Sequence, residues 1–233
     1  CTYIRKKACS QKKSLITYAN VNALNLAQDD PAFKQVLVDA DMVYCDGFGA
    51  KLASIILNNI SCHRLTCPDY IDDLLKVCSK DNLSIYIVGE KKGIAGCFST
   101  KAKESHPGLK ISGYHDGFFD LESKTSEHVL QEIKTLSPDL IIAAMGQPKQ
   151  ELFSSYILPK LKKGVFLCVG GCLLYHIGEE RRAPRLMTDH CMEWFCRLCS
   201  HPIRYFSRYV TGNIRFFIRL LSCSLIRRIM PRG

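Results

Sequence analysis

The chain has 233 residues, of which 47% are hydrophobic and 23% charged, and its formal net charge is +10. This length allows one domain with a sizeable core, and the composition excludes a low-complexity or fibrous chain. We expect no membrane span, because arginines interrupt the most apolar candidate, 214–229. We also expect no signal peptide, because the basic start is not followed by an apolar core. Thirteen irregularly spaced cysteines favour free thiols in a reducing, cytosolic setting.

The pattern of hydrophobic residues predicts strands that alternate with helices. Short apolar runs predict strands at 14–20, 40–47, 83–89, 109–115, 138–146 and 164–171. Longer segments predict helices at 32–38, 49–59, 127–136 and 149–161, with another that passes through Lys103. Buried runs alternating with helices are typical of an α/β protein, here a Rossmann-like, mainly parallel sheet with flanking helices.

The turns after these strands contain most of the unusual polar residues and glycines. They are Asn20, Asp46 with Gly47, Gly89, Asp116 with Gly117, 146–151, and Gly170 with Gly171. Each glycine alone is ordinary punctuation at a strand end. Ligands of parallel sheets bind outside the carboxyl ends of the strands, so these turns together predict one crevice for a polar ligand.

Two motifs suggest other functions. Residues 89–96 (GEKKGIAG) open a helix, and their amides would suit a diphosphate. Their glycine spacing differs from the dinucleotide motif, and an NAD-type oxidoreductase is kept as an alternative. Asp39 and Asp41 resemble a metal-binding pair, but they precede their strand and so face the wrong end of the sheet. We therefore expect no metal site.

The C-terminal part of the chain is strongly basic. Residues 201–233 contain no lysine and no acid, but they contain Arg204, Arg208, Arg215, Arg219, Arg227, Arg228 and Arg232. On one helix the first four of these would lie within about 60° of each other, opposite aromatic and aliphatic residues. We predict a domain at 1–195 and a basic helical appendage at 196–233 that binds anionic lipid at a membrane surface. A packing helix, a lid over phosphates and a nucleic-acid-binding stripe are the alternatives.

Blocks of sequence along nearly the whole chain resemble the WecG/TagA/CpsF glycosyltransferases. In order they are YANVNALNLA, ADMVYCDGFGAKLA, HRLTCPDY, IYIVGEKKGIA, HPGLKISGYHDGFF, PDLIIAAMGQPKQE, VGG, RRAPR and MEWFCRLCSHPIRYFSRY. The resemblance implies an inverting enzyme without cofactor or metal. Such an enzyme transfers a sugar from a UDP-sugar to a polyprenyl-diphosphate-linked saccharide.

The resemblance also implies a place and partners. It places the enzyme on the cytoplasmic face of the cell membrane, where it would help to build teichoic acid linkage units, capsule or related polysaccharides. No nucleic acid is expected as a partner, and a homo-oligomer is a further candidate. The remaining alternative is a non-enzymatic module that binds a membrane or a nucleic acid.

Residue roles follow from the same resemblance. Asp46 matches the proposed general base, and Arg64 and Gln150 match the other expected catalytic positions. The expected substrate-binding residues are Thr17, Asn20, Gly47, Asp69, Gly89, Phe118, Gly146, Glu151, Gly170, Arg182, Arg204 and Arg208. A carboxylate such as Asp46 would take the proton of the acceptor hydroxyl. Leu174 stands where many members have an aspartate, so we expect recognition of the base or donor sugar to differ.

Overall fold

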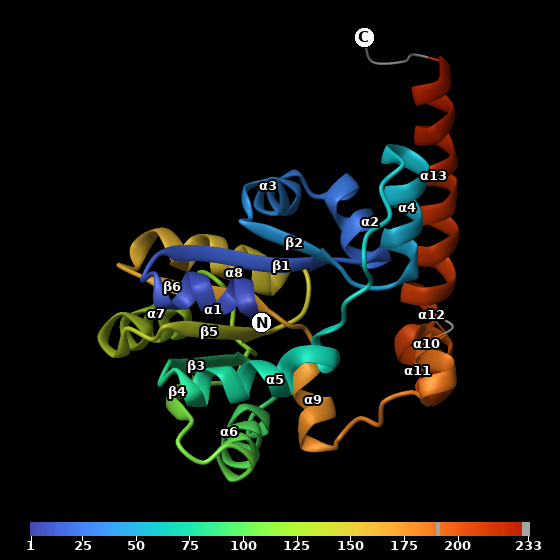
Figure 1. Ribbon diagram of the computed structural model, residues 1–233. Helices are drawn as coiled ribbons and strands as arrows, with labels where there is room; N and C mark the ends of the chain where they lie inside the picture. Colours follow the sequence, from blue (N-terminus) through green and yellow to red (C-terminus); the bar gives the residue numbers. More distant parts are fainter. Residues whose placement is uncertain (190–191, 230–233) are drawn as a thin grey trace. The chain divides into compact units, whose positions relative to one another are not determined.

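The structure, a computed structural model, describes residues 1–189 and 192–229 (Figure 1). Of residues 185, 189, 204 and 226–229, only the backbone is described. Six strands form one sheet in the order β2-β1-β6-β5-β3-β4. The strands are β1 (Lys13–Ala19), β2 (Met42–Cys45), β3 (Ser84–Gly89), β4 (Lys110–His115), β5 (Leu140–Ala144) and β6 (Gly164–Cys168). The pairings β1–β6, β6–β5, β5–β3 and β3–β4 are parallel, which confirms the predicted α/β, Rossmann-like fold.

Helices connect and follow the strands. In the first half of the chain they are α1 (Thr2–Cys9), α2 (Val21–Asp29), α3 (Pro31–Asp39), α4 (Phe48–Asn58), α5 (Cys67–Lys80) and α6 (Ile94–Ser105). In the second half they are α7 (Lys124–Leu136), α8 (Lys149–Ile157), α9 (Cys172–Ile177), α10 (Arg185–Asp189), α11 (Glu193–Ser200), α12 (Pro202–Phe206) and α13 (Gly212–Ile229). The hydrophobic pattern located the strands but did not predict the helices α1, α2, α5, α9 and α10.

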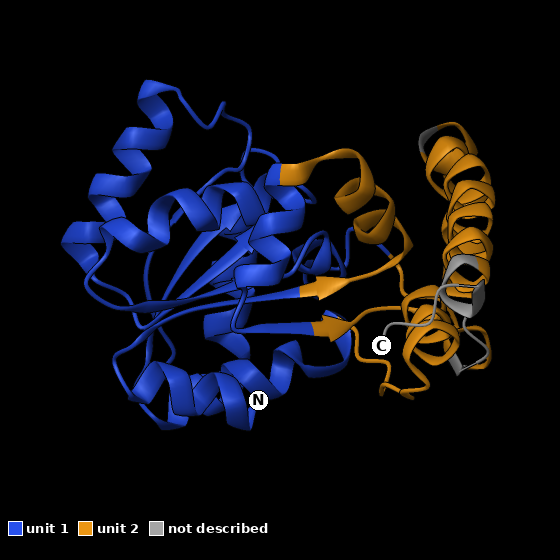
Figure 2. Ribbon diagram, turned by 90° about the horizontal axis from the view of Figure 1, so that it is seen from above, with its two compact units in different colours: residues 1–17, 32–43, 67–180 blue, residues 18–31, 44–66, 181–233 orange. Residues whose placement is uncertain are grey.

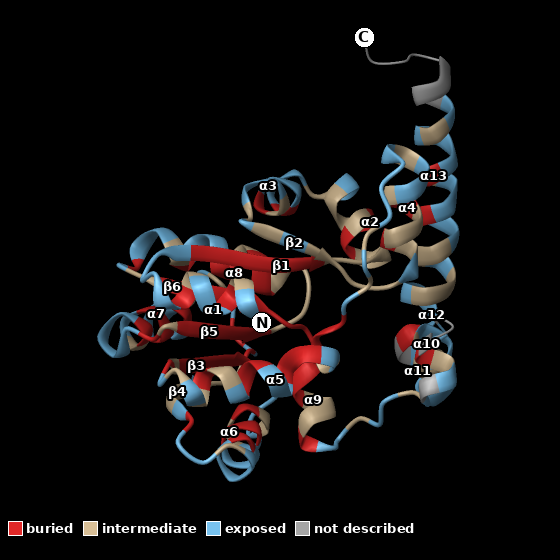
Figure 3. Cartoon of the chain, in the orientation of Figure 1, coloured by how far each residue is buried: buried red, intermediate tan, exposed pale blue. Residues whose placement is uncertain are grey.

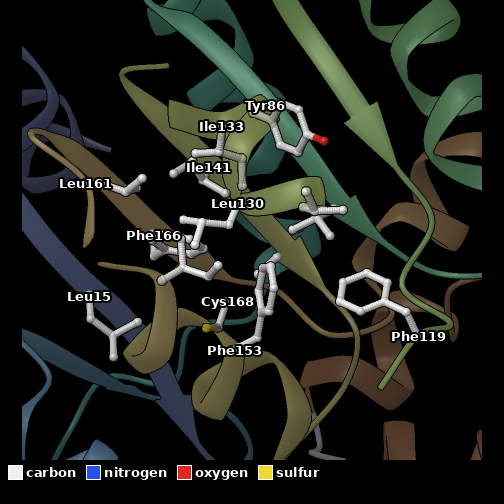
Figure 4. Close-up of a cluster of buried hydrophobic side chains, with 14 of the residues drawn as sticks. Leu15, Tyr86, Phe119, Leu130, Ile133, Ile141, Phe153, Leu161, Phe166 and Cys168 are labelled. Atoms are coloured by element: carbon white, nitrogen blue, oxygen red, sulfur yellow. The ribbon is translucent and has the colours of Figure 1, made fainter. Parts of the chain in front are cut away.

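The core explains why the central strands are apolar along their whole length. Alternate residues of β3, β5 and β6 pack with α7 and α8 in one buried cluster that includes Tyr86, Ile141, Phe153 and Phe166 (Figure 4). The residues between them in sequence are buried as well, such as Ile142 at 0% exposure. Because successive side chains of a strand point to opposite faces, burial of both sets requires helices on both faces of the sheet. The strands therefore read as continuous apolar runs, and β5, for example, is buried along its whole length (Figure 3).

The chain divides into two compact units (Figure 2). Unit 1 contains residues 1–17, 32–43 and 67–180, with most of the sheet and the cluster of Figure 4. Unit 2 contains residues 18–31, 44–66 and 181–233. In unit 2, Phe216 and Leu220 of α13 are buried with Ala53 of α4 and contact Val21. The expected division into a domain at 1–195 and a membrane-binding appendage at 196–233 stays a prediction.

The apolar content of the helices bears on membrane insertion. Over 1–189 and 192–229, no helix combines the length and the hydrophobicity that a transmembrane crossing requires.

Candidate active site

The candidate general base, in unit 2, lies directly after strand β2. Asp46 follows β2, and its N–H donates to the carbonyl of Ala19 at 2.9 Å, so the backbone at the ends of β2 and β1 is joined. Gly47 then begins α4 with a φ of +97°, a conformation that residues with a Cβ rarely adopt. This turn requires a glycine, and it holds Asp46 between the strand and the first turn of the helix.

Asn20 orients the carboxylate of Asp46. Its Oδ1 accepts from the N–H of Ala23 and so caps α2, which leaves its amide nitrogen free to donate elsewhere. That nitrogen donates to Oδ2 of Asp46 at 3.3 Å. The cap therefore determines which end of the Asn20 amide faces the acid, and it explains why an asparagine suits this position better than an aspartate.

Two arginines and a glutamate form the rest of this group. Arg64, from the segment between α4 and α5, donates to Oε2 of Glu193 at 3.2 Å. Arg197, one turn further along α11, donates to the other oxygen of Glu193 at 3.0 Å. Of these three residues, the family resemblance indicated Arg64 only. Glu193 and Arg197 lie in the quoted block MEWFCRLCSHPIRYFSRY, but nothing in their spacing linked them to Arg64.

The surroundings of Asp46 shift its protonation. Burial is the largest influence and raises the pKa of Asp46 above its usual range. The hydrogen bond from Asn20 and the positive charges of Arg197 and Arg64 act in the opposite direction on this pKa, while Glu193 raises it further. The side chain stays half-buried, so part of its surface is accessible. A carboxylate with a raised pKa is a stronger base than a free aspartate and suits proton abstraction near neutral pH.

A second carboxylate, in unit 1, is fully enclosed. Oε1 of Glu151 accepts from the hydroxyl of Thr17 and the amide of Gln150, both at 2.8 Å, and from the amide of Gln147 at 3.3 Å. Gln150 in turn accepts from the N–H of Gly170 at 3.0 Å. This network joins β1, the start of α8 and the loop after β6 inside unit 1.

The enclosure of Glu151 governs its chemistry. Glu151, Gln150 and Thr17 are all 0% exposed. Burial raises the pKa of Glu151, partly opposed by its three donors. Among the described residues no group hydrogen-bonds to its second oxygen, Oε2. The side chains of these three residues contact protein groups. The expected catalytic role of Gln150 and the expected substrate contacts of Thr17 and Glu151 stay predictions.

The other expected substrate-binding residues lie at separate places. In unit 1, Asp69 is exposed in the first turn of α5, and Phe118 is 71% exposed. Gly146 has a φ of +76° with open space where a Cβ would stand. In unit 2, Arg182 donates to the hydroxyl of Thr66 at 3.3 Å, and Arg208 is exposed. The side chain of Arg204 lies outside the described residues.

Two glycines have a packing role. A Cβ on Gly49 would stand 2.2 Å from a methyl group of Val21, so this glycine lets α4 approach α2. A Cβ on Gly89 would stand 2.4 Å from the backbone of Ala144, so that glycine lets β3 approach β5. The space beside Gly49 is thus filled by Val21 and is not open to a ligand.

Two of the four arginines of the predicted stripe are engaged in contacts within unit 2. Arg215 and Arg219 both donate to Asp29, at 2.9 and 2.6 Å, and Arg219 also donates to the carbonyl of Asn25. The two arginines therefore share a face of α13, as predicted, but that face meets α2. Over 1–189 and 192–229, no three histidine, cysteine, aspartate or glutamate side chains gather to hold a metal ion. Metal independence stays a prediction.

Comparison with known proteins assigns the chain. The sequence model described as "Glycosyl transferase WecG/TagA/CpsF family" matches residues 1–229. The chain belongs to this family. It is thus a glycosyltransferase, and we set aside the oxidoreductase and the non-enzymatic module.

Similar proteins within the WecG/TagA/CpsF family share one name, N-acetylglucosaminyldiphosphoundecaprenol N-acetyl-beta-D-mannosaminyltransferase. The protein of Bacillus subtilis (strain 168) is 30% identical over 204 residues, which cover 87% of this chain and 78% of that protein. That of Bacillus spizizenii is 26% identical, covering 88% and 80%. That of Staphylococcus aureus (strain NCTC 8325 / PS 47) is 27% identical, covering 81% and 72%.

Proposed function

We propose that this family member transfers an N-acetylhexosamine from a UDP-sugar to a polyprenyl-diphosphate-linked N-acetylglucosamine, with inversion. The names of the relatives support the acceptor and the class of donor sugar. The product would enter a bacterial cell-surface polysaccharide such as a teichoic acid. The observation that carries the proposal is the half-buried Asp46, hydrogen-bonded to Asn20 and close enough to two arginines for them to lower its pKa.

The chemistry of the transfer fits this group of residues. An acceptor hydroxyl is a weak nucleophile near neutral pH, so a base must take its proton as the bond to the anomeric carbon forms. Asp46 would accept that proton on its carboxylate. The departing UDP gains negative charge, and preorganised cations stabilise such charge. Arg64 and Arg197 are the cations of this group.

The decisive experiment compares Asp46→Asn with the wild type. The amide keeps the shape of the side chain and an oxygen that can accept from Asn20, but it cannot take a proton. We expect a transferase rate at least about 100-fold lower with a UDP-N-acetylhexosamine and a short-chain lipid-diphosphate acceptor. UDP should still raise the melting temperature of the variant, because binding to the native state stabilises it. Near wild-type turnover would refute Asp46 as the base.

We also propose that the C-terminal part contacts the inner face of the cell membrane. An exposed apolar stripe on α13 supports this proposal. It consists of Ile214, Phe217, Ile218, Leu221 and Leu225, which are 46–66% exposed and recur at helical spacing. Since Arg215 and Arg219 are paired with Asp29, this stripe is a better candidate for the membrane contact than the arginines.

Liposome sedimentation tests the membrane contact. The double substitution Phe217→Ser and Leu221→Ser should reduce binding to anionic vesicles, because it removes exposed apolar surface without touching buried Phe216 and Leu220. The control is Arg215→Gln, which removes a charge and leaves the stripe intact. Unchanged sedimentation of the double variant would contradict a membrane role for this face.

A further inference from the structure

Glu193 is not among the residues expected from the sequence, yet it is the common partner of Arg64 and Arg197, the two arginines that act on the candidate base. Each of its carboxylate oxygens accepts from a different guanidinium group, Oε2 from Arg64 and Oε1 from Arg197. Its side chain is only 14% exposed, and those of Arg64 and Arg197 are 20% and 29% exposed. These pairs are thus better shielded from water than ordinary surface ion pairs, which contribute little.

The arginine from the loop is held at a defined place. The N–H of Leu65, next to Arg64, donates to the carbonyl of Cys45 at 2.9 Å, and Cys45 is the residue before Asp46. The backbone beside Arg64 is therefore tied to the strand end that carries the base. Glu193 then ties the Arg64 side chain to α11, and through Arg197 it orders a second guanidinium group in the same unit.

We propose that Glu193 is a positioning residue that holds Arg64 and Arg197 as a fixed pair beside Asp46, so that both guanidinium groups are oriented for a diphosphate group of the substrate. This inference rests on the proposed function. A guanidinium group binds phosphate oxygens through a planar fork of N–H donors, so its orientation matters as much as its charge. Long arginine side chains would otherwise have to lose rotamer freedom when the substrate binds. Glu193 provides that order in advance.

The charges around Asp46 make the role of Glu193 measurable. The groups that act on Asp46 are Arg64 from the loop, Glu193 and Arg197 from α11, and the neutral amide of Asn20 from α2. Cys45 on β2 has a pKa raised to about 11 by burial, so its thiol is neutral at working pH. Removing the charge of Glu193 leaves the positive charge of the arginines uncompensated. Loss of the negative charge of Glu193 should therefore lower the pKa of Asp46, and so should the uncompensated positive charge of the arginines.

The test is Glu193→Gln, which keeps the length of the side chain and one accepting oxygen. We expect kcat with a UDP-sugar to fall about tenfold, because the arginines lose their fixed orientation. The acid limb of the pH–rate profile should move to lower pH, because the pKa of Asp46 falls. Glu193→Asp, which keeps the charge on a shorter side chain, should return the acid limb to the wild-type position. It also serves as a second variant if the glutamine variant does not fold.

A matched control is Asp29→Asn, which breaks the ion pairs to Arg215 and Arg219 in the same unit. It should leave the acid limb unchanged, since Asp29 is not among the groups that act on Asp46. If Glu193→Gln retains the wild-type kcat and acid limb while Asp46→Asn is inactive, the positioning role is refuted and the proposed base survives. If Asp46→Asn is fully active, the proposed base itself fails.

Discussion

Two carboxylates, Asp46 in unit 2 and Glu151 in unit 1, look alike in sequence, because each lies just after a strand, at or near the start of a helix. Burial raises the pKa of both. Glu151 is 0% exposed, and three neutral donors share one of its oxygens. Asp46 is half-buried, accepts from one amide, and has charges of both signs around it. The difference teaches that a raised pKa alone does not identify a base, because the base must also reach a substrate.

The largest expected difference between these carboxylates is in catalysis. Glu151→Gln keeps the oxygen that accepts from Thr17, Gln147 and Gln150, so we expect its transferase rate to stay within about tenfold of the wild type. The transferase rate of Asp46→Asn should be at least about 100-fold lower than that of the wild type. Parallel measurement of kcat for the two variants checks this. If Glu151→Gln loses as much activity as Asp46→Asn while UDP still binds, Glu151 takes part in the chemistry.

The next largest effect is on folding. Glu151→Ala removes the acceptor of two buried donors, Thr17 and Gln150, and of the half-buried Gln147, and each unsatisfied buried donor costs about 1–3 kcal/mol. We expect the free energy of unfolding to fall by at least about 2 kcal/mol. Urea denaturation followed by circular dichroism measures it. A loss below about 1 kcal/mol would show that water or the backbone replaces the carboxylate.

The control for that measurement is Glu151→Gln, which keeps the acceptor but does not titrate. The pKa of Glu151 is raised in the folded state, so the folded protein binds the proton more tightly than the unfolded chain. The stability that this provides is fully present below the ordinary glutamate pKa and is lost as pH rises through the raised pKa. The wild type should therefore lose stability relative to Glu151→Gln as pH rises through that window.

A smaller effect concerns the orientation of Asp46. Asn20→Asp keeps the cap on α2 but replaces the donor to Asp46 with a second carboxylate. The nearby negative charge should raise the pKa of Asp46, so the acid limb of the pH–rate profile should move to higher pH. Asn20→Ser also keeps the cap and removes the donor without adding charge, so its shift should be smaller. Equal shifts in the two variants would show that charge at this position does not act on the base.

The smallest effect is expected at the ion pair on α13. Arg215 and Asp29 are 56% and 37% exposed, so water screens their attraction. Arg215→Gln should change the free energy of unfolding by less than about 1 kcal/mol. Thermal denaturation at low and high salt measures this change. A loss above about 2 kcal/mol would show that the arginine face of α13 is a major contact of unit 2.

The sequence by itself determined the strands, the fold class and the family. Strands buried on both faces are continuous apolar runs, and this local pattern is visible without any structure. The position of Asp46 at a strand end could be read in the same way, because it depends only on neighbours in the chain.

Only the tertiary structure decided which of the selected residues are enclosed and which charges meet. The pairing of Arg64 with Glu193 joins residues 129 positions apart, and no periodicity encodes such a distance. The same holds for Thr17 and Glu151, which are 134 positions apart. Helix and strand periods report which face a residue occupies, but the partner on that face is chosen by how the elements pack. For that reason the sequence indicated Asp46 as a candidate base, and the fold identified Glu193 as the partner of both arginines beside it.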